Sequence, residues 1–156
     1  MGQAQNYSEK LRTFLTSRNI WHHFIEFNEP VKTVEQAAKK VQVEKIAKSI
    51  VMVDSDDNFL VAIVPAKNRV SHRKIKILLA VRDLRLASPQ EVLDKCGYPV
   101  GGVSPFNNIS RVLLDPQVLK NNTTIVGGGD IDKLLEIRAI DIVDVLNPKI
   151  ADITRD

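Results

Sequence analysis

SIVMVDSDDNFLVAIVP, residues 49–65, places two apolar runs on either side of a short polar segment. The runs 49–54 and 59–65 are rich in Val and Ile, which favour strands. The Ser-Asp-Asp-Asn segment between them consists of residues that favour turns. Two such runs joined by a short turn predict a β-hairpin.

Helices are predicted on both sides of this hairpin. Apolar residues recur at helical spacing in 8–18, which indicates an amphipathic helix. Thr33 and Gln36 have the spacing of a capping box, so a short helix is expected to run through Lys40. Further predicted elements are a strand at 21–27, a basic helix from Ser71, a helix that starts after Ser88 and ends at Gly97, strands at 111–114 and 124–126, and a closing strand and helix between 134 and 146. The pattern predicts a mixed α/β fold.

Composition narrows the class of protein. The chain has 156 residues, 44% hydrophobic and 26% charged, which suits one domain over 1–156 with residues 1–19 as a helical lead. No apolar run approaches the length of a membrane span, so no membrane partner is expected. The lone Cys96 cannot form an internal disulfide, which favours the reducing cytoplasm. Neither CxxC nor HExxH occurs, so we expect no metal and no cofactor.

Positive charge gathers in residues 65–85, where seven Lys or Arg face a single acidic residue, Asp83. Such a block is typical of a surface that binds phosphates, but it is equally compatible with a solvated helix face. The candidate tRNA-binding residues in it are Lys67, Arg69, Arg73, Lys74 and Lys76.

Two glycine-rich stretches are candidates for a binding site. GYPVGGVSPF, residues 97–106, is either a tight corner or a loop whose backbone N–H groups face a carbonyl oxygen as it becomes negative. Gly127-Gly128-Gly129-Asp130 follows a predicted strand but matches neither GxGxxG nor a P-loop. It therefore favours a second wall of one pocket over a nucleotide site.

Few residues suggest covalent catalysis. Cys96 is more typical of a buried small residue than of a nucleophile. His22 and His23 are adjacent in a predicted strand and therefore face opposite sides. Lys48 enters an apolar strand and would supply a cation to the pocket if its side chain points inward.

Several stretches together resemble the YbaK/ProX family of aminoacyl-tRNA deacylases, which also occur as editing domains in prolyl-tRNA synthetases. The resemblance covers about residues 20–156. It is carried by TVEQAAKKVQVEKIAKSIVM (33–52), LVAIVPAKNRV (60–70), SPQEVLDKCGYPVGGVSPF (88–106), IVGGGDIDKLLEIRAIDIVDVL (125–146) and ADITRD (151–156). It implies a mixed, partly barrel-like sheet flanked by helices, and hydrolysis of the ester between a wrong amino acid and the 3′ end of tRNA.

The resemblance also implies roles for individual residues. Lys48 would hold the terminal nucleotide or the substrate, and Gly101 and Gly102 would present backbone N–H groups to the aminoacyl carbonyl. The residues implied to line the substrate site are Val103, Ser104, Pro105, Gly127, Gly128 and Gly129. The implied partners are the acceptor end of an aminoacyl-tRNA and an aminoacyl-tRNA synthetase. Positioning and oxyanion stabilisation would then suffice without a protein nucleophile.

The sequence departs from the family pattern at one place. Cysteine-specific members carry Ser at the first position of the late glycine turn and Asp seven residues later, where this chain has Gly127 and Leu134. The amino acid therefore stays open among Ala, Ser and other small residues, on tRNA-Pro or a related tRNA. Two other functions remain: a non-catalytic module that binds aminoacyl-tRNA or a synthetase, and a small-molecule or nucleotide-binding protein that uses residues 127–130.

Overall fold

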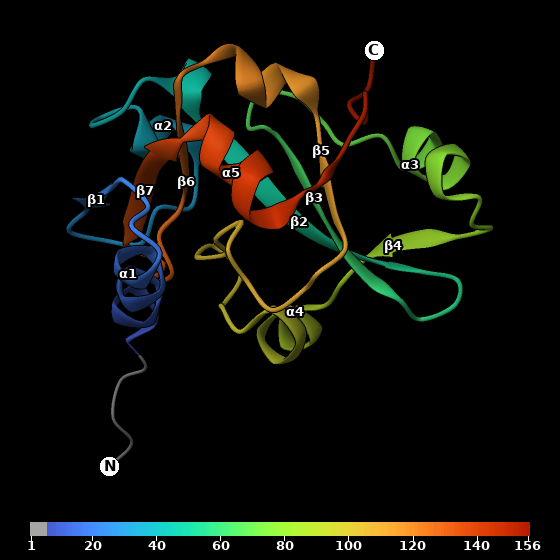
Figure 1. Cartoon of the computed structure of the whole chain (residues 1–156), viewed down its shortest axis with the longest axis horizontal. Coiled ribbons are helices and arrows are strands. Elements are labelled where there is room, and N and C mark those ends of the chain that lie inside the picture. Colours follow the sequence, from blue (N-terminus) through green and yellow to red (C-terminus); the bar gives the residue numbers. More distant parts are fainter. Residues whose placement is uncertain (1–5) are drawn as a thin grey trace.

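The predicted hairpin forms the centre of the larger of two sheets in the computed structural model, which describes residues 6–156 (Figure 1). Strand β2 (Ala47–Asp54) pairs antiparallel with β3 (Phe59–Pro65) along almost its whole length. The remaining strands of this sheet are β4 (Leu84–Leu86), β5 (Val112–Leu114) and β8 (Lys149–Ile150), in the order β4-β2-β3-β5-β8. Strands β3, β5 and β8 run parallel, so this sheet is mixed.

The smaller sheet is antiparallel and has the order β1-β7-β6. Its strands are β1 (His22–Glu26), β6 (Thr123–Gly127) and β7 (Lys133–Arg138). A parallel bridge between Ile46 and Ile125 joins the start of β2 to β6. The mixed α/β fold is therefore confirmed, and within residues 6–156 both sheets stay open rather than closing into one barrel.

The expected N-caps Thr33, Ser71 and Ser88 are present, and five α-helices surround the sheets within residues 6–156. They are α1 (Tyr7–Ser17), α2 (Val34–Ala37), α3 (His72–Leu79), α4 (Pro89–Cys96) and α5 (Ala139–Leu146), with 3₁₀ turns at Val43–Lys45 and Pro116–Lys120. Both capping boxes are present, one at Thr33 and one at Ser88. Residues 1–5 of the predicted helical lead lie outside the described residues.

Two differences from the predicted elements have a local cause. Helix α2 ends at Ala37 rather than Lys40, because the N–H groups of Lys39 and Lys40 bond carbonyls three residues back instead of four. The basic block also contains the short strand β4, which continues the sheet beside β2. Three residues are too few for a hydrophobic period to reveal a strand.

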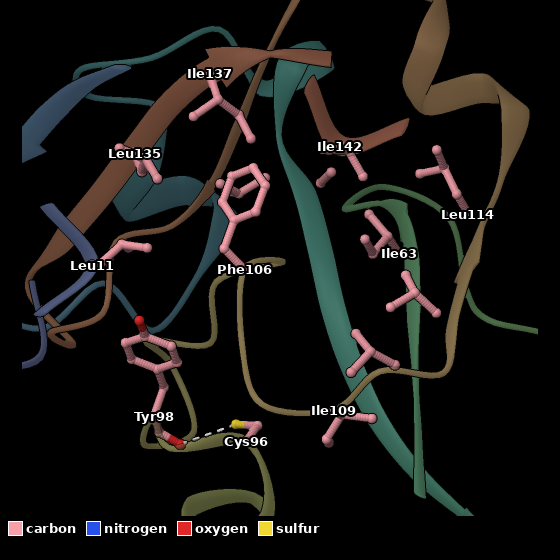
Figure 2. Packing of buried hydrophobic residues seen from close by; sticks show 14 of the residues in the cluster. Leu11, Ile63, Cys96, Tyr98, Phe106, Ile109, Leu114, Leu135, Ile137 and Ile142 are labelled. Carbon is pink, nitrogen blue, oxygen red and sulfur yellow. Dashed lines mark hydrogen bonds between the residues drawn. The ribbon is translucent and has the colours of Figure 1, made fainter. Parts of the chain in front are cut away.

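The main core lies between the two sheets (Figure 2). Ile137 of β7 faces Ile63 of β3 across the ring of Phe106, and all three are almost fully buried. Cys96 belongs to this core, where its Sγ donates to the carbonyl oxygen of Tyr98 at 3.5 Å. Burial raises the pKa of the Cys96 thiol, so the sulfur stays protonated and packs as a small apolar group.

A second apolar cluster lies between the larger sheet and α3, at the far end of the molecule from α1 (Figure 1). The last residues of the chain cover it. The Lys74 ammonium binds Asp152 at 2.9 Å, Asp156 at 2.8 Å and the carbonyl oxygen of Thr154 at 2.7 Å. The bonds to Asp156 and then Asp152 raise the pKa of Lys74. This residue therefore fixes the C-terminal segment to α3.

The turn of the β2–β3 hairpin is closed by a buried carboxylate. Asp54 accepts hydrogen bonds from the N–H groups of Asp56 at 2.8 Å and Asn58 at 3.0 Å, and its other oxygen binds Arg111 at 2.8 Å. The Asp54 side chain is 1% exposed. The bond from Arg111 holds the pKa of Asp54 below its usual range, and the backbone bonds add to this against the cost of burial.

No helix within residues 6–156 has both the length and the apolar character needed to cross a bilayer.

We predict that Asp54→Asn lowers the free energy of unfolding by about 2–3 kcal/mol, because it leaves Arg111 without its partner and breaks a turn. A depressed native pKa contributes stability that is present above the unfolded value and is lost as the pH falls through the native value. Urea unfolding at pH 7 and below pH 3.8 should therefore show a smaller acid loss in the variant. The control is Asp83→Asn, which removes an exposed carboxylate. If Asp54→Asn and Asp83→Asn lowered the free energy of unfolding at pH 7 equally, this role of Asp54 would be contradicted.

Candidate functional site

A cavity of about 400 Å³ opens beside the first half of β2. Strand β4 pairs with β2 only at residues 52–54, and the last bond along this edge runs from the N–H of Ala87 to the carbonyl of Val51. The edge before Val51 is therefore free, and the cavity lies along it. The lining comes from residues 31–34 and 37 around α2, 46–51 of β2 and its approach, Ala66, 86–87, Val92, 100, 101 and 103 of the glycine loop, 126–127 of β6 and Leu134 of β7.

The lining is apolar and carries only positive charge. Among these residues are Lys32 and Lys48, and no Asp or Glu. Within residues 6–156 neither ammonium group forms an ion pair. Lys48 is exposed at the strand edge. A cation beside an apolar hollow favours a ligand with one anionic or carbonyl group and one small uncharged group.

Ser49 adds a polar atom that the sequence did not reveal. Ser49 lies among the lining residues, but its Oγ is closed off from solvent and has no hydrogen-bond partner within the described chain. A buried hydroxyl without a partner is costly, so this atom is a local expense of the fold rather than a contact offered to the cavity. Lys32 and the α2 segment were also missed, because their place at the cavity depends on contacts far along the chain.

The loop at 97–106 is held by its own turns. Gly97 ends α4 with φ +89°, and the N–H of Gly102 donates to Pro99 at 2.9 Å. The Ser104 hydroxyl is fully buried and accepts from the N–H of Phe106 at 3.1 Å. Within residues 6–156, the N–H groups of Gly101 and Val103 have no acceptor. The loop thus combines a fixed shape with free donors at the cavity wall.

The two glycine stretches pack main chain against main chain. The N–H of Gly129 donates to the carbonyl oxygen of Gly102 at 2.9 Å. A Cβ atom on Gly102 would lie 2.0 Å from the oxygen of Gly129, and one on Gly127 would lie 2.2 Å from the oxygen of Val103. Both positions therefore need glycine for close approach of the backbone.

The structure separates the predicted site residues into two layers. Lys48, Gly101, Val103 and Gly127 line the cavity. The others lie outside the lining, in the loop and turn behind it: Gly102, Ser104, Pro105, Gly128 and Gly129. At this point the lining residues are thus backed directly by buried residues of the same two segments.

None of the predicted tRNA-binding residues lines the cavity. Lys67 directly follows Ala66, which does, whereas Arg73, Lys74 and Lys76 lie on α3. Lys67, Arg69 and Arg73 are exposed, whereas the ammonium of Lys74 is bound to the C-terminal segment.

Over residues 6–156, no group of three or more His, Cys, Asp or Glu side chains is arranged as a metal site.

A family profile described as "Aminoacyl-tRNA editing domain" matches residues 28–145, which is most of the chain. The chain belongs to the aminoacyl-tRNA editing domain family. The matched region contains Lys48, the glycine loop and the glycine turn, but not α1. The resemblance read from the sequence motifs is therefore confirmed at the level of the family.

Similar proteins include both a synthetase and a short protein. The proline–tRNA ligase of Thermosipho africanus is 32% identical over 105 residues, which are 65% of this chain but only 18% of that ligase. The chain thus spans about a fifth of the length of such ligases. YwhH of Bacillus subtilis is 28% identical over 133 residues, or 83% of this chain and 84% of YwhH.

Solved structures share the fold over the full length of this editing domain. The protein APE2540 superimposes with a TM-score of 0.83 at 26% identity, covering 94% of this chain and 99% of that one. A protein described as a candidate trans-editing enzyme for prolyl-tRNA synthetase gives 0.86 at 24% identity, covering 99% and 100%. The second match concerns the fold alone.

We predict that Gly102→Ala lowers the free energy of unfolding by about 1–3 kcal/mol, because its Cβ meets backbone that cannot rotate away. Thermal unfolding measures this. Val100→Ala, an exposed change two residues earlier in the loop, is the matched control and should leave the midpoint unchanged. If Gly102→Ala unfolded at the same midpoint temperature as the wild type, the backbone at Gly129 would have room for a Cβ atom, and the close contact would be contradicted.

Proposed function

We propose that this editing domain is a trans-acting deacylase that hydrolyses the ester of a small amino acid misattached to tRNA-Pro or a related tRNA. The observation that carries the proposal is the combination at one cavity of the unpaired Lys48 ammonium with the unbonded N–H groups of Gly101 and Val103. An aminoacyl-tRNA end offers a partner for each feature: the terminal nucleotide carries negative phosphate for the cation, and the ester has a carbonyl oxygen for the donors.

In the proposed reaction, water adds to the ester carbonyl carbon, and the negative charge that develops on the carbonyl oxygen is stabilised by the free N–H groups of Gly101 and Val103. The bond from the carbonyl carbon to the ribose oxygen then breaks, and the proton from the water ends on that ribose oxygen. Lys48 binds the terminal nucleotide and keeps the ester in place. No protein nucleophile is required, which agrees with the protonated, buried state of Cys96.

The lining of the cavity supports a small, uncharged amino acid. Gly127 and Leu134 both lie in the wall, at the positions where cysteine-specific relatives carry Ser and Asp. A side chain at 127 would collide with the carbonyl oxygen of Val103, so this backbone arrangement excludes serine there.

The basic surface supports binding of the tRNA acceptor end. Lys67, Arg69, Arg73 and Lys76 have no ion-pair partner among the described residues, so their charge is available to phosphates. Lys74 is already neutralised by two carboxylates, and we exclude it from the proposed contact. We propose a prolyl-tRNA synthetase as the source of the mischarged tRNA, because relatives of this chain occur within such ligases.

We predict that a deacylation panel with tRNA-Pro carrying Ala, Ser, Cys or Pro shows turnover of at least one small amino acid and sparing of Pro. Lys48→Ala should lower this rate by about 10²-fold, because an ester that is no longer held in place lies out of line with the donors of the loop. The exposed Lys39→Ala serves as the control and should keep the wild-type rate. Binding without turnover on every substrate would favour a non-catalytic module, and full activity of Lys48→Ala would remove Lys48 from the site.

We further predict that turnover at limiting tRNA falls as salt rises, because released counterions drive binding to phosphates. Arg73→Ala should raise KM, lower the salt dependence and leave kcat unchanged. Lys74→Ala is the matched variant on the same helix. It should lower thermal stability through loss of the C-terminal contacts, without changing the salt dependence. Equal salt dependence of wild type and Arg73→Ala would show that this surface does not contact tRNA.

A further inference from the structure

The carboxylate of Asp130 binds the first turn of a helix that is distant in sequence. Its Oδ1 accepts from the N–H of Tyr7 at 3.1 Å, and its Oδ2 accepts from the N–H of Ser8 at 3.3 Å and from the Ser8 hydroxyl at 2.6 Å. Tyr7 and Ser8 are 123 and 122 positions from Asp130. N–H groups in the first turn of a helix have no partner within the helix, so this carboxylate satisfies two of them.

Helix α1 also has an ordinary local cap, which makes the contact with Asp130 a separate feature. Asn6 accepts from the N–H of Glu9 at 3.1 Å, as expected of an N-cap residue. The local cap serves the helix alone, whereas Asp130 belongs to the glycine turn that follows β6. A second, long-range cap therefore joins α1 to that turn.

The glycine turn contacts both α1 and the loop that lines the cavity. Gly129, directly before Asp130, packs so closely on α1 that a Cβ there would lie 2.8 Å from the backbone carbon of Tyr7. On its other side, the N–H of Gly129 donates to the carbonyl of Gly102 at 2.9 Å. The neighbours of Gly102 in the chain, Gly101 and Val103, line the cavity. Two successive contacts and one covalent step along the chain thus connect the start of α1 with the cavity wall.

We propose that Asp130 is a positioning residue, which by capping α1 fixes the Gly127–Gly129 turn and through it the backbone donors of Gly101 and Val103. The inference rests on the proposed function, since it assigns those donors to the ester carbonyl. It also makes α1 part of the active-site scaffold, although α1 lies outside the region 28–145 that defines the family.

The charge of Asp130 suits this role. Burial by itself raises the pKa of this carboxyl group. The bonds from the Ser8 hydroxyl and from the N–H groups of Ser8 and Tyr7 outweigh that effect, and the pKa lies below its usual range. Lys133 adds an ammonium 3.6 Å from Oδ2. The group is therefore a carboxylate at neutral pH, and it accepts all of these bonds at once.

The test compares Asp130→Asn with Asn6→Ala, since both remove a cap from α1 but only the first breaks the link to the turn. Both variants should unfold at a lower temperature than the wild type. Asp130→Asn should lower kcat for the deacylation substrate by about tenfold with KM unchanged, because a displaced donor affects the transition state more than binding. Asn6→Ala should keep the wild-type kcat. A wild-type kcat in Asp130→Asn, or equal losses in the two variants, would overturn the proposal.

Amide hydrogen exchange gives a readout that does not depend on activity. The Gly129 N–H is protected by its bond to Gly102, so its exchange should be faster in Asp130→Asn and unchanged in Asn6→Ala. If the wild type hydrolyses none of the mischarged tRNAs, the proposed function fails, while this exchange still decides the link. Unchanged protection of Gly129 in Asp130→Asn would overturn the link from α1 to the loop.

Discussion

The hydrogen bond from Gly129 to Gly102 is the contact on which the rest of the site depends. It joins the loop before β5 to the turn after β6 with no side chain between them. On one side of this contact lie the free N–H groups of the loop, and on the other lies α1. A backbone contact at this distance tolerates little change, because the main chain has no rotamers through which to yield. The packing of the two glycine stretches therefore determines the shape of the site.

The parts of the fold that the sequence predicted are those with local causes. The Thr33 and Ser88 capping boxes each use a partner three residues away, and the hairpin needs only the apolar runs and turn within 49–65. The contact between Ser8 and Asp130 spans 122 residues, and the α2 wall of the cavity depends on how two sheets meet. No short pattern encodes such pairs. Motif resemblance did place Lys48 and the loop in one site, since the family preserves the long-range arrangement.

The lysines of this protein differ in whether a carboxylate binds them. The cavity contains two lysines and no acid, so its field attracts an anion without a competing internal partner. Lys74, by contrast, is held by Asp152 and Asp156, although the sequence places it in the middle of the basic block. A count of basic residues overestimates the available charge, because side chains from the end of the chain fold back onto the block.

The cavity has two kinds of wall. The wall that includes Gly101 and Gly127 rests on main chain, and a side chain at Gly127, or at Gly102 behind the wall, would collide with backbone. The wall made by Val31, Val34 and Leu134 is built from side chains that meet the hollow directly. Under the proposed function, residues of the second wall can be exchanged to change the amino acid preference, while the donors in the first wall stay in place. Selectivity and reactivity are thereby separable traits in this scaffold.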